Sequence, residues 1–300
     1  MHVVFRESHG LEETDTPTDL GQETAELVVL SFSDSDLGAF AAGWHRASGG
    51  LPSLRLANLV ALRHPLSVDT YVERTLAGAK GILIRLIGGE SYWSYGLMQV
   101  QDLARRNGIA LAILPADGRE DARLDALSTL PVSTLRRLSA LCDAGGAVAA
   151  QAALQQLSLA AGLYSGPVVG DKTVPEFGFY LPSAGVVPAP AAGGKPLAVV
   201  CFYRSYLTSA DTDPVDEMIG ALNERGFRAI GLFATSLKAP AASHWIAEEM
   251  RRLGPAAIVN ATAFSAKGSD GSASPLDVAG CPVFQVALST ARRKEWATSD

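Results

Sequence analysis

Residues 198–222 read AVVCFYRSYLTSADTDPVDEMIGAL, and this stretch decides the predicted fold. The apolar run at 197–203 is typical of a buried β-strand, and the polar stretch after it predicts a loop. A helix then begins at Asp213-Pro214, because aspartate caps helix N-termini and proline is favoured at the first helical position. The apolar residues that follow at helical spacing are Val215, Met218, Ile219 and Leu222. Strand, loop and amphipathic helix in this order predict one repeat of a parallel α/β sheet.

The same alternation of strands and helices is predicted along most of the chain. The predicted strands are 27–32, 54–59, 81–87, 109–114, 197–203, 227–234, 256–260 and 282–288. The predicted helices begin at Asp34 or Ser35 and at Asp213, and otherwise span 67–76, 92–106, 131–143, 147–161 and 241–253. This pattern predicts the α/β class, with two doubly wound, Rossmann-like units and mainly parallel sheets.

A helical and Pro/Gly-rich connection is predicted between the two units. Residues 165–196 show little periodicity and end in PAPAAGGKP, a composition typical of linkers. The predicted domains are a first α/β unit at 1–145, the connection at 146–196 and a second α/β unit at 197–300.

Composition excludes several classes of protein. The 300 residues carry a net charge of −6 and no basic cluster, which argues against a nucleic-acid partner. The first residues lack the pattern of a signal peptide, and no apolar run approaches the roughly 18 residues of a membrane span. Cys142, Cys201 and Cys281 form no CxxC pair, so reduced thiols and a cytoplasmic location are expected.

Polar residues follow the predicted strands at the edge where parallel sheets bind ligands. They are Arg204, Tyr206 and Thr208 after one strand, Asn260, Thr262 and Phe264 after another, and Ser31, Ser33 and Asp34 in the first unit. Arg204 is the leading candidate, because a guanidinium can hold a carboxylate or amide through two hydrogen bonds. The alternative is an ion pair of Arg204 with Asp211, Asp213 or Asp216, and helix capping is the alternative for the other residues.

Known catalytic motifs are missing. The segment GPVVGDKT (166–173) lacks the glycine that a phosphate-binding loop requires before its lysine. No GxGxxG follows a predicted strand, no GxSxG is present, and the five histidines lack the spacing of metal ligands. The motifs therefore predict no catalytic residue, no metal ligand and no bound cofactor.

Several segments together resemble the large subunit of aerobic cobaltochelatase, a family related to the large subunit of magnesium chelatase. They are LVVLSFSDSDL (27–37), LRLANLVALRHPLSVDTYVE (54–73), ILIRLIGGESYWSYG (82–96), the opening stretch at 198–222, VNATAFSA (259–266) and SPLD (274–277). The resemblance is collinear and covers essentially the whole chain. Because the family's large subunit is several times longer, the resemblance implies that this chain is its amino-terminal portion.

The resemblance implies a role in cobalamin biosynthesis. In the family, Co²⁺ is inserted as a substrate into hydrogenobyrinic acid a,c-diamide, and two AAA+ subunits hydrolyse the ATP. No catalytic residue is transferred by motif, so this chain alone is expected to be inactive. Arg204, Tyr206, Asn260, Thr262 and Phe264 are expected to approach the carboxylate and amide arms of the corrin.

Two alternatives remain open. One is a magnesium chelatase large subunit acting on protoporphyrin. The other is a non-catalytic scaffold that docks the ATPase subunits or the rest of the large subunit, with the aromatic residues of GGESYWSYG (88–96) as interface anchors. Core packing by Trp93 is the alternative for that segment.

Overall fold

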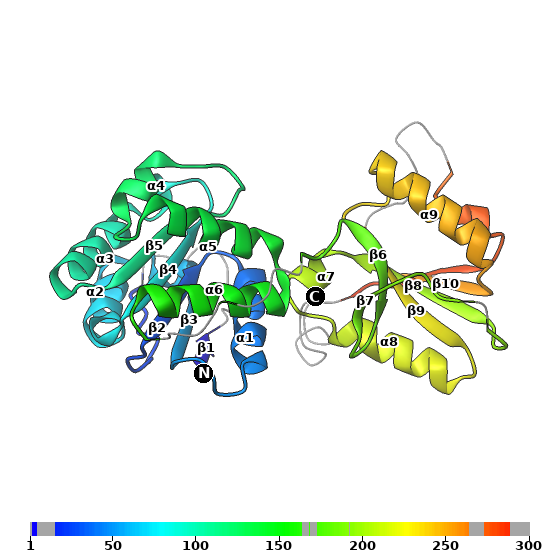
Figure 1. Ribbon diagram of the computed structural model, residues 1–300, viewed down its shortest axis with the longest axis horizontal. Coiled ribbons are helices and arrows are strands. Elements are labelled where there is room, and N and C mark those ends of the chain that lie inside the picture. The colour runs from blue at the N-terminus through cyan, green and yellow to red at the C-terminus, as the bar shows by residue number, and fades with distance from the viewer. Residues whose placement is uncertain are drawn as a thin grey trace. The chain divides into compact units, whose positions relative to one another are not determined.

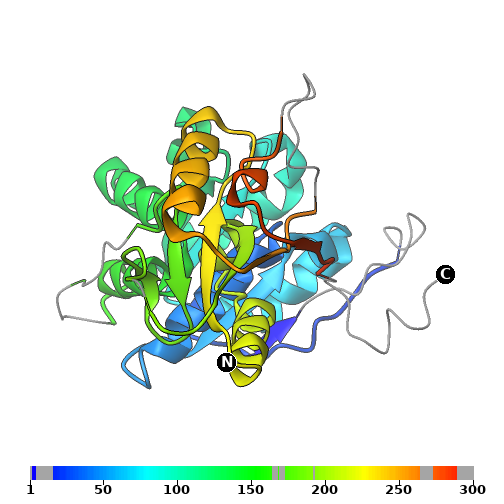
Figure 2. The same ribbon diagram turned by 90° about the vertical axis from the view of Figure 1, so that its right-hand side faces the viewer.

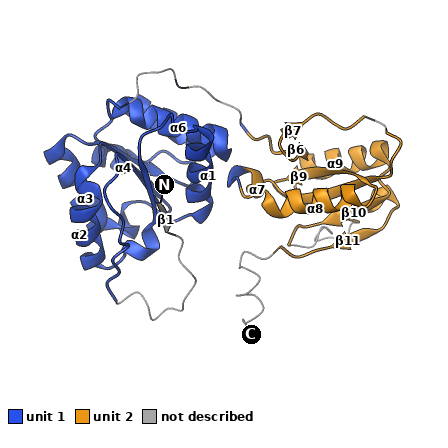
Figure 3. Cartoon of the chain, turned by 90° about the horizontal axis from the view of Figure 1, so that it is seen from below, with its two compact units in different colours: residues 1–173, 208–210 blue, residues 174–207, 211–300 orange. Residues whose placement is uncertain are grey.

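The protein consists of two compact α/β units. The computed structural model describes residues 2–4, 16–163, 168, 173–191, 193–263 and 273–288. Unit 1 comprises residues 1–173 and 208–210, and unit 2 comprises residues 174–207 and 211–300 (Figure 3). Each unit contains a sheet with parallel strands and with helices packed on its faces, so the predicted fold class is confirmed.

Unit 1 contains a five-stranded parallel sheet with the strand order β1-β3-β2-β4-β5 (Figure 1). The strands are β1 (His2–Val4), β2 (Leu27–Ser31), β3 (Leu54–Asn58), β4 (Gly81–Leu86) and β5 (Ala110–Pro115). The helices are α1 (Asp34–Arg46), α2 (Pro65–Arg74), α3 (Ser94–Asn107), α4 (Ala122–Leu127), α5 (Val132–Ala144) and α6 (Gly146–Ala160). Side chains of α2, α3 and α4 join the core on one face of the sheet, and those of α1, α5 and α6 join it on the other. The sheet is therefore doubly wound, as predicted, and β4 is one of its interior strands.

Unit 2 contains a six-stranded sheet with the order β11-β10-β8-β9-β6-β7. Strands β8 (Leu197–Tyr203), β9 (Arg228–Ala234), β10 (Ala257–Asn260) and β11 (Val283–Gln285) are parallel, whereas β6 (Phe177–Leu181) and β7 (Gly185–Val187) form an antiparallel hairpin beside β9. The helices are α7 (Ser205–Thr208), α8 (Asp213–Glu224) and α9 (Pro240–Leu253). Helices α8 and α9 contribute to the cores on opposite faces of the sheet (Figure 2). Strand β8 is an interior strand, which confirms the prediction made from the opening stretch.

Short 3₁₀ helices complete the described structure. They are η2 (Leu59–Leu62), η3 (Leu76–Gly78), η4 (Glu90–Tyr92) and η5 (Asp277–Ala279). None of the helices in the described ranges combines the length and the apolar character that crossing a bilayer would require.

The predicted connection at 146–196 differs from the structure. Helix α6 lies within unit 1, where its alanines pack beside α1, and the hairpin of β6 and β7 belongs to the sheet of unit 2 (Figure 1). Alanine-rich helices and short hairpins give weak periodic signals, because small side chains and single turns carry little apolar contrast. The boundary between the units therefore lies near residue 173 rather than across 146–196.

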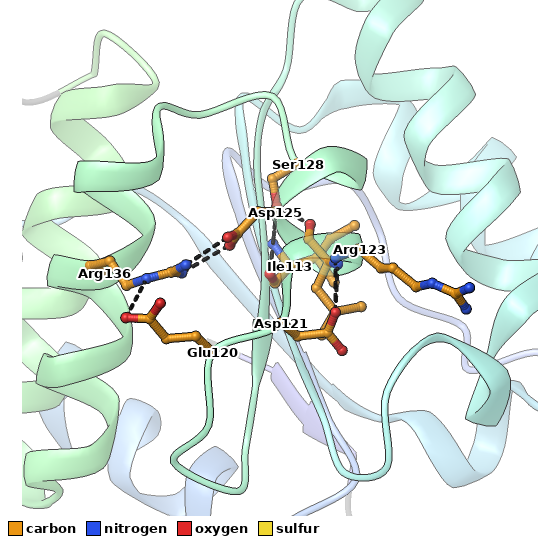
Figure 4. A network of polar contacts seen from close by, with 8 residues as sticks. Ile113, Glu120, Asp121, Arg123, Asp125, Ser128 and Arg136 are labelled. Carbon is orange, nitrogen blue, oxygen red and sulfur yellow. Dashed lines mark hydrogen bonds and ion pairs between the residues drawn. The ribbon is translucent and has the colours of Figure 1, made fainter.

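A polar network holds α4 against the end of β5 (Figure 4). Arg136 of α5 donates to both carboxylate oxygens of Asp125 on α4, at 2.9 Å and 2.6 Å. Asp121 caps α4 by accepting the backbone N–H groups of its first turn at 2.9 Å and 3.3 Å. Ser128 accepts the backbone N–H of Ile113 at 2.9 Å. These bonds fix the loop that follows β5 at the carboxyl edge of the sheet.

The contact between α1 and α6 depends on the absence of a side chain at Gly43. A Cβ atom there would lie 2.6 Å from the backbone nitrogen of Gln151 and 3.0 Å from the carbonyl oxygen of Ala147, both on α6. Backbone atoms cannot move aside as a flexible side chain can, so any larger residue would force the helices apart.

We therefore predict that Gly43→Ala lowers the free energy of unfolding by about 1–3 kcal/mol, the usual cost of overpacking. Gly220→Ala is the matched control, because Gly220 is an exposed residue of α8 with no atom within 4 Å of the position of an added Cβ. That control should be neutral or stabilising by up to about 1 kcal/mol, since alanine favours helix. Urea denaturation of both variants measures the difference, and equal stability of the two would refute the packing argument.

Candidate functional site

The carboxyl ends of β8 and β10 form the switch point of the sheet in unit 2. The chain leaves β8 for β9 on one side and later places β10 on the other side of β8. In open α/β sheets, ligands bind at this position, because the connecting loops diverge there. The residues predicted as a site lie at the end of these two strands or just after them.

Arg204 follows β8, and its described side-chain partners are backbone carbonyl groups of unit 2. Its Nη2 donates to the carbonyl oxygen of Val174 at 2.7 Å, and its Nε donates to those of Val174 and Pro175 at 3.2 Å and 2.9 Å. The half-buried guanidinium thus holds the segment that leads into β6. The alternative prediction was an ion pair of Arg204 with Asp211, Asp213 or Asp216. Among the described residues, the contacts of the guanidinium are with carbonyl groups instead. The segment at Val174 lies far from Arg204 in sequence, so no local pattern indicated it.

Asn260 and Thr262 form a hydrogen-bonded network with Gln285. The amide of Asn260 donates to Oε1 of Gln285 at 2.8 Å and accepts the hydroxyl of Thr262 at 2.9 Å. The amide of Gln285 donates to the carbonyl oxygen of Thr262 at 2.7 Å. The structure therefore brings two predicted site residues together and adds Gln285, which is not among the residues predicted as a site. Gln285 lies in the middle of the predicted strand 282–288, and only the observed end of β11 at Gln285 places it at the carboxyl edge.

The remaining predicted residues of unit 2 have separate surroundings. Tyr206 is half-buried, and its ring lies edge-on to Phe202 with 6.4 Å between ring centroids. Burial raises the pKa of Tyr206, and the charge of Asp211 adds to this effect. Phe264 lies outside the described residues. Asp216 accepts the hydroxyl of Tyr180 at 2.7 Å.

The equivalent edge of unit 1 contains a buried arginine. Arg85 on β4 is 5% exposed and donates to Oδ1 of Asp36 at 2.8 Å and to Oδ1 of Asp143 at 2.6 Å. Burial by itself would lower the pKa of Arg85, but the neighbouring negative charges outweigh it and raise the pKa. The guanidinium therefore stays charged and links β4 to α1 and α5. The sequence showed a single charge within an apolar strand but gave no indication of its partners.

The polar residues predicted at this edge in unit 1 act mainly as caps. Ser33 is the N-cap of α1 and accepts the backbone N–H of Asp36 at 3.3 Å. The hydroxyl of Ser31 donates to Oδ2 of Asp36 at 2.8 Å, and Asn58 at the end of β3 donates to Asp34 at 2.7 Å. The capping interpretation is therefore confirmed for Ser33, and the aspartates are tied to the strand ends.

The aromatic segment at 88–96 is divided between core and surface. Trp93 is buried and donates its indole N–H to the carbonyl oxygen of Leu62 at 2.7 Å, as the core-packing alternative predicts. Tyr95 donates to Asp69 at 2.8 Å. Tyr92 is 63% exposed, so it remains available as an interface residue. Beside α3, Tyr95 and Met98 line a shallow cavity of about 490 Å³.

Side chains of the types that bind metals are scattered over the part of the chain that the structure describes. Within those ranges, no three His, Cys, Asp or Glu side chains are grouped so that they could hold a metal ion. The described edges instead present a guanidinium, amides and hydroxyl groups. Such groups can bind carboxylate or amide substituents of a ligand.

A family model and two curated proteins match this chain. The model described as CobN/Magnesium Chelatase matches residues 157–300. The protein named aerobic cobaltochelatase subunit CobN from Sinorhizobium sp is 35% identical over 316 residues, which cover 100% of this chain and 24% of that protein. The protein of the same name from Pseudomonas aeruginosa is 29% identical, and the match covers 99% of this chain and 24% of that protein. The chain thus spans about a quarter of the length of these relatives.

A solved structure shares the fold. The catalytic subunit of cobaltochelatase from Mycobacterium tuberculosis superposes with a TM-score of 0.69 and is 24% identical in sequence. The match covers 93% of this chain and 22% of that one.

We predict that Arg204→Ala lowers the free energy of unfolding by about 1–3 kcal/mol, because hydrogen bonds from a charged group to the carbonyls of Val174 and Pro175 are lost. Arg204→Lys should recover part of this loss, since one ammonium group cannot reproduce both contacts. Arg225→Ala is the control, because exposed Arg225 donates to the carbonyl oxygen of Ala221 at the end of α8. It should change stability by less than about 0.5 kcal/mol. Urea titration measures the free energy of unfolding of all three variants. If Arg204→Ala is as stable as the wild type, these hydrogen bonds contribute nothing to stability.

Proposed function

Because the chain is a relative of aerobic cobaltochelatase large subunits over its whole length, we propose that it forms part of the corrin-binding large subunit of an ATP-dependent cobalt chelatase. The observation that carries this proposal is the 35% identity to a curated cobaltochelatase subunit across 100% of this chain. The proposed reaction inserts Co²⁺ into hydrogenobyrinic acid a,c-diamide during cobalamin biosynthesis in the cytoplasm. Two AAA+ subunits would hydrolyse the ATP.

The proposed chemistry is an exchange of protons for a metal ion. Co²⁺ enters the ring as two ring N–H groups lose their protons, so the enzyme must supply bases and must remove water from the metal. The described residues of this chain offer no group of metal ligands. We therefore assign the metal-handling step to other parts of the large subunit.

The proposed contribution of this chain is recognition of the corrin's peripheral arms at the edge of unit 2. Arg204, Tyr206, Asn260, Thr262 and Phe264 are the residues proposed for this role. A guanidinium and an amide suit the carboxylate and amide groups of the substrate, and an aromatic ring suits its apolar surface. The support is the position of four of these residues at or just after the ends of β8 and β10.

Docking of other domains is the second candidate role. The hydrogen bonds of Arg204 to its own unit favour it, and so does the closed network of Asn260, Thr262 and Gln285. Groups that already have hydrogen-bond partners within the chain must give them up to bind a substrate. This exchange reduces the net free energy gained on binding. A magnesium chelatase acting on protoporphyrin is less well supported, because both curated relatives are named cobaltochelatase subunits.

We predict that the 300-residue chain, mixed with the two AAA+ subunits, ATP, Co²⁺ and the metal-free corrin, inserts no cobalt. The full-length large subunit that contains this chain should insert cobalt under the same conditions and only with ATP. The absorbance change of the corrin on metal insertion measures both reactions. Mg²⁺ with protoporphyrin is the control for the other family activity. Magnesium insertion without cobalt insertion, or cobalt insertion by the short chain, would contradict the proposal.

A further inference from the structure

Strand β11 of unit 2 carries exposed apolar side chains: Phe284 is 57% exposed, and Val283, on the opposite face, is 39% exposed. The larger exposure lies on the side of α8 and continues to β10. The pairing register places Val259 of β10 beside Val200 of β8 and Phe284 of β11 beside Val259. Paired residues of parallel strands point to the same side of a sheet, so all three lie on the side of α8. Val200 is fully buried under the core that α8 joins, whereas Phe284 is 57% exposed. The exposure of these side chains therefore increases from β8 toward β11. Strand β11 is the dark red arrow in Figure 2.

In unit 1, helices cover the strand that corresponds to β11. Strands β2, β3, β4 and β5 have the same relative order as β8, β9, β10 and β11. On the α1 side of that sheet, Ala112 and Leu114 of β5 are at most 1% exposed. They are buried because α5 packs on β5 and α6 packs on β4, and both helices follow β5 in the chain. In unit 2, α8 packs on β8 and β9.

A parallel sheet with an apolar face needs a covering layer. Parallel sheets in proteins are covered on both faces, because each strand carries apolar residues on both sides. The exposed residues here belong to the face of the sheet rather than to the backbone edge of β11. A helix laid on the face would bury them, whereas an added strand would mainly use the backbone groups of the edge.

We propose that the surface formed by Val259 and Phe284 docks an amphipathic helix from the part of the large subunit that lies outside these 300 residues. This inference rests on the proposed function, because the curated relatives are much longer than this chain, which spans 24% of their length. The docked helix takes the place that α5 and α6 occupy in unit 1. In unit 1 the helices that cover this face, α5 and α6, come after β5 in the chain, and we place the docked helix after β11 by the same order.

Hydrogen exchange tests the proposal on the 300-residue chain and on the full-length large subunit. We expect amide exchange across β10 and β11 to be about tenfold slower or more in the full-length subunit, because a docked helix suppresses local opening. Phe284→Glu should abolish this difference by placing a carboxylate in the contact. Val186→Glu is the matched control, because Val186 on β7 is also an exposed apolar residue, 45% exposed, at the opposite edge of the same sheet. It should leave the protection of β10 and β11 unchanged.

Three outcomes would overturn the inference. They are equal exchange in the short and full-length chains, protection that survives Phe284→Glu, and protection of the short chain that rises with its concentration. The last result would identify a second copy as the occupant. A full-length subunit that inserts cobalt without protecting β11 would refute this inference and leave the proposed function standing. Protection of β11 in a full-length subunit that inserts no cobalt would refute the proposed function and leave this inference standing.

Discussion

The structure depends on one constraint, which is that an apolar parallel sheet has to be covered on both faces. Unit 1 meets this constraint with α2, α3 and α4 on one side and with α1, α5 and α6 on the other. The close approach of α6 to α1 at Gly43 is part of that covering. Unit 2 meets it over β8 and β9 but leaves Phe284 of β11 exposed. The contrast between the two units is the physical basis for the proposed docking of a helix on β10 and β11.

Both units place an arginine near the carboxyl edge of an interior strand, and each arginine has structural partners. Arg85 holds Asp36 and Asp143, whereas Arg204 holds the carbonyl groups of Val174 and Pro175. The cost of desolvation offsets much of the Coulombic gain of a buried ion pair. Arg85 therefore fixes the arrangement of β4, α1 and α5 more than it adds stability. Rigid edges of this kind suit a binding surface, because pre-ordered groups lose less entropy when a ligand binds.

Much of this fold could be predicted from sequence, because long apolar strands and amphipathic helices have strong periods. Strand 197–203 and the helix begun at Asp213 lie where the opening stretch predicted them. Helix α6 was predicted but assigned to a connection, since its alanines give no clear apolar face. Strands β6 and β7 were missed in a Pro/Gly-rich segment, because their pairing with β9 is a tertiary interaction.

The candidate site was less predictable, because partners distant in sequence decide its geometry. Strand ends pointed to Asn260 and Thr262, but the network that Gln285 completes depends on the register of β10 and β11. The partner of Arg204 lies about 30 residues earlier in the chain. Local sequence patterns carry no information about such pairings.

The central claim is that the carboxyl edge of unit 2 contacts the corrin, and the affinity of the full-length large subunit for metal-free hydrogenobyrinic acid a,c-diamide tests it most directly. Tyr206→Phe removes one hydroxyl and keeps the ring that packs against Phe202. If the Tyr206 hydroxyl binds the corrin, the affinity of this variant should be about three- to tenfold weaker, which corresponds to the loss of one hydrogen bond. Tyr92→Phe, an equal change on the exposed surface of unit 1, should leave the affinity unchanged. Equal affinities for the wild type and the Tyr206 variant would contradict the claim and favour the docking role.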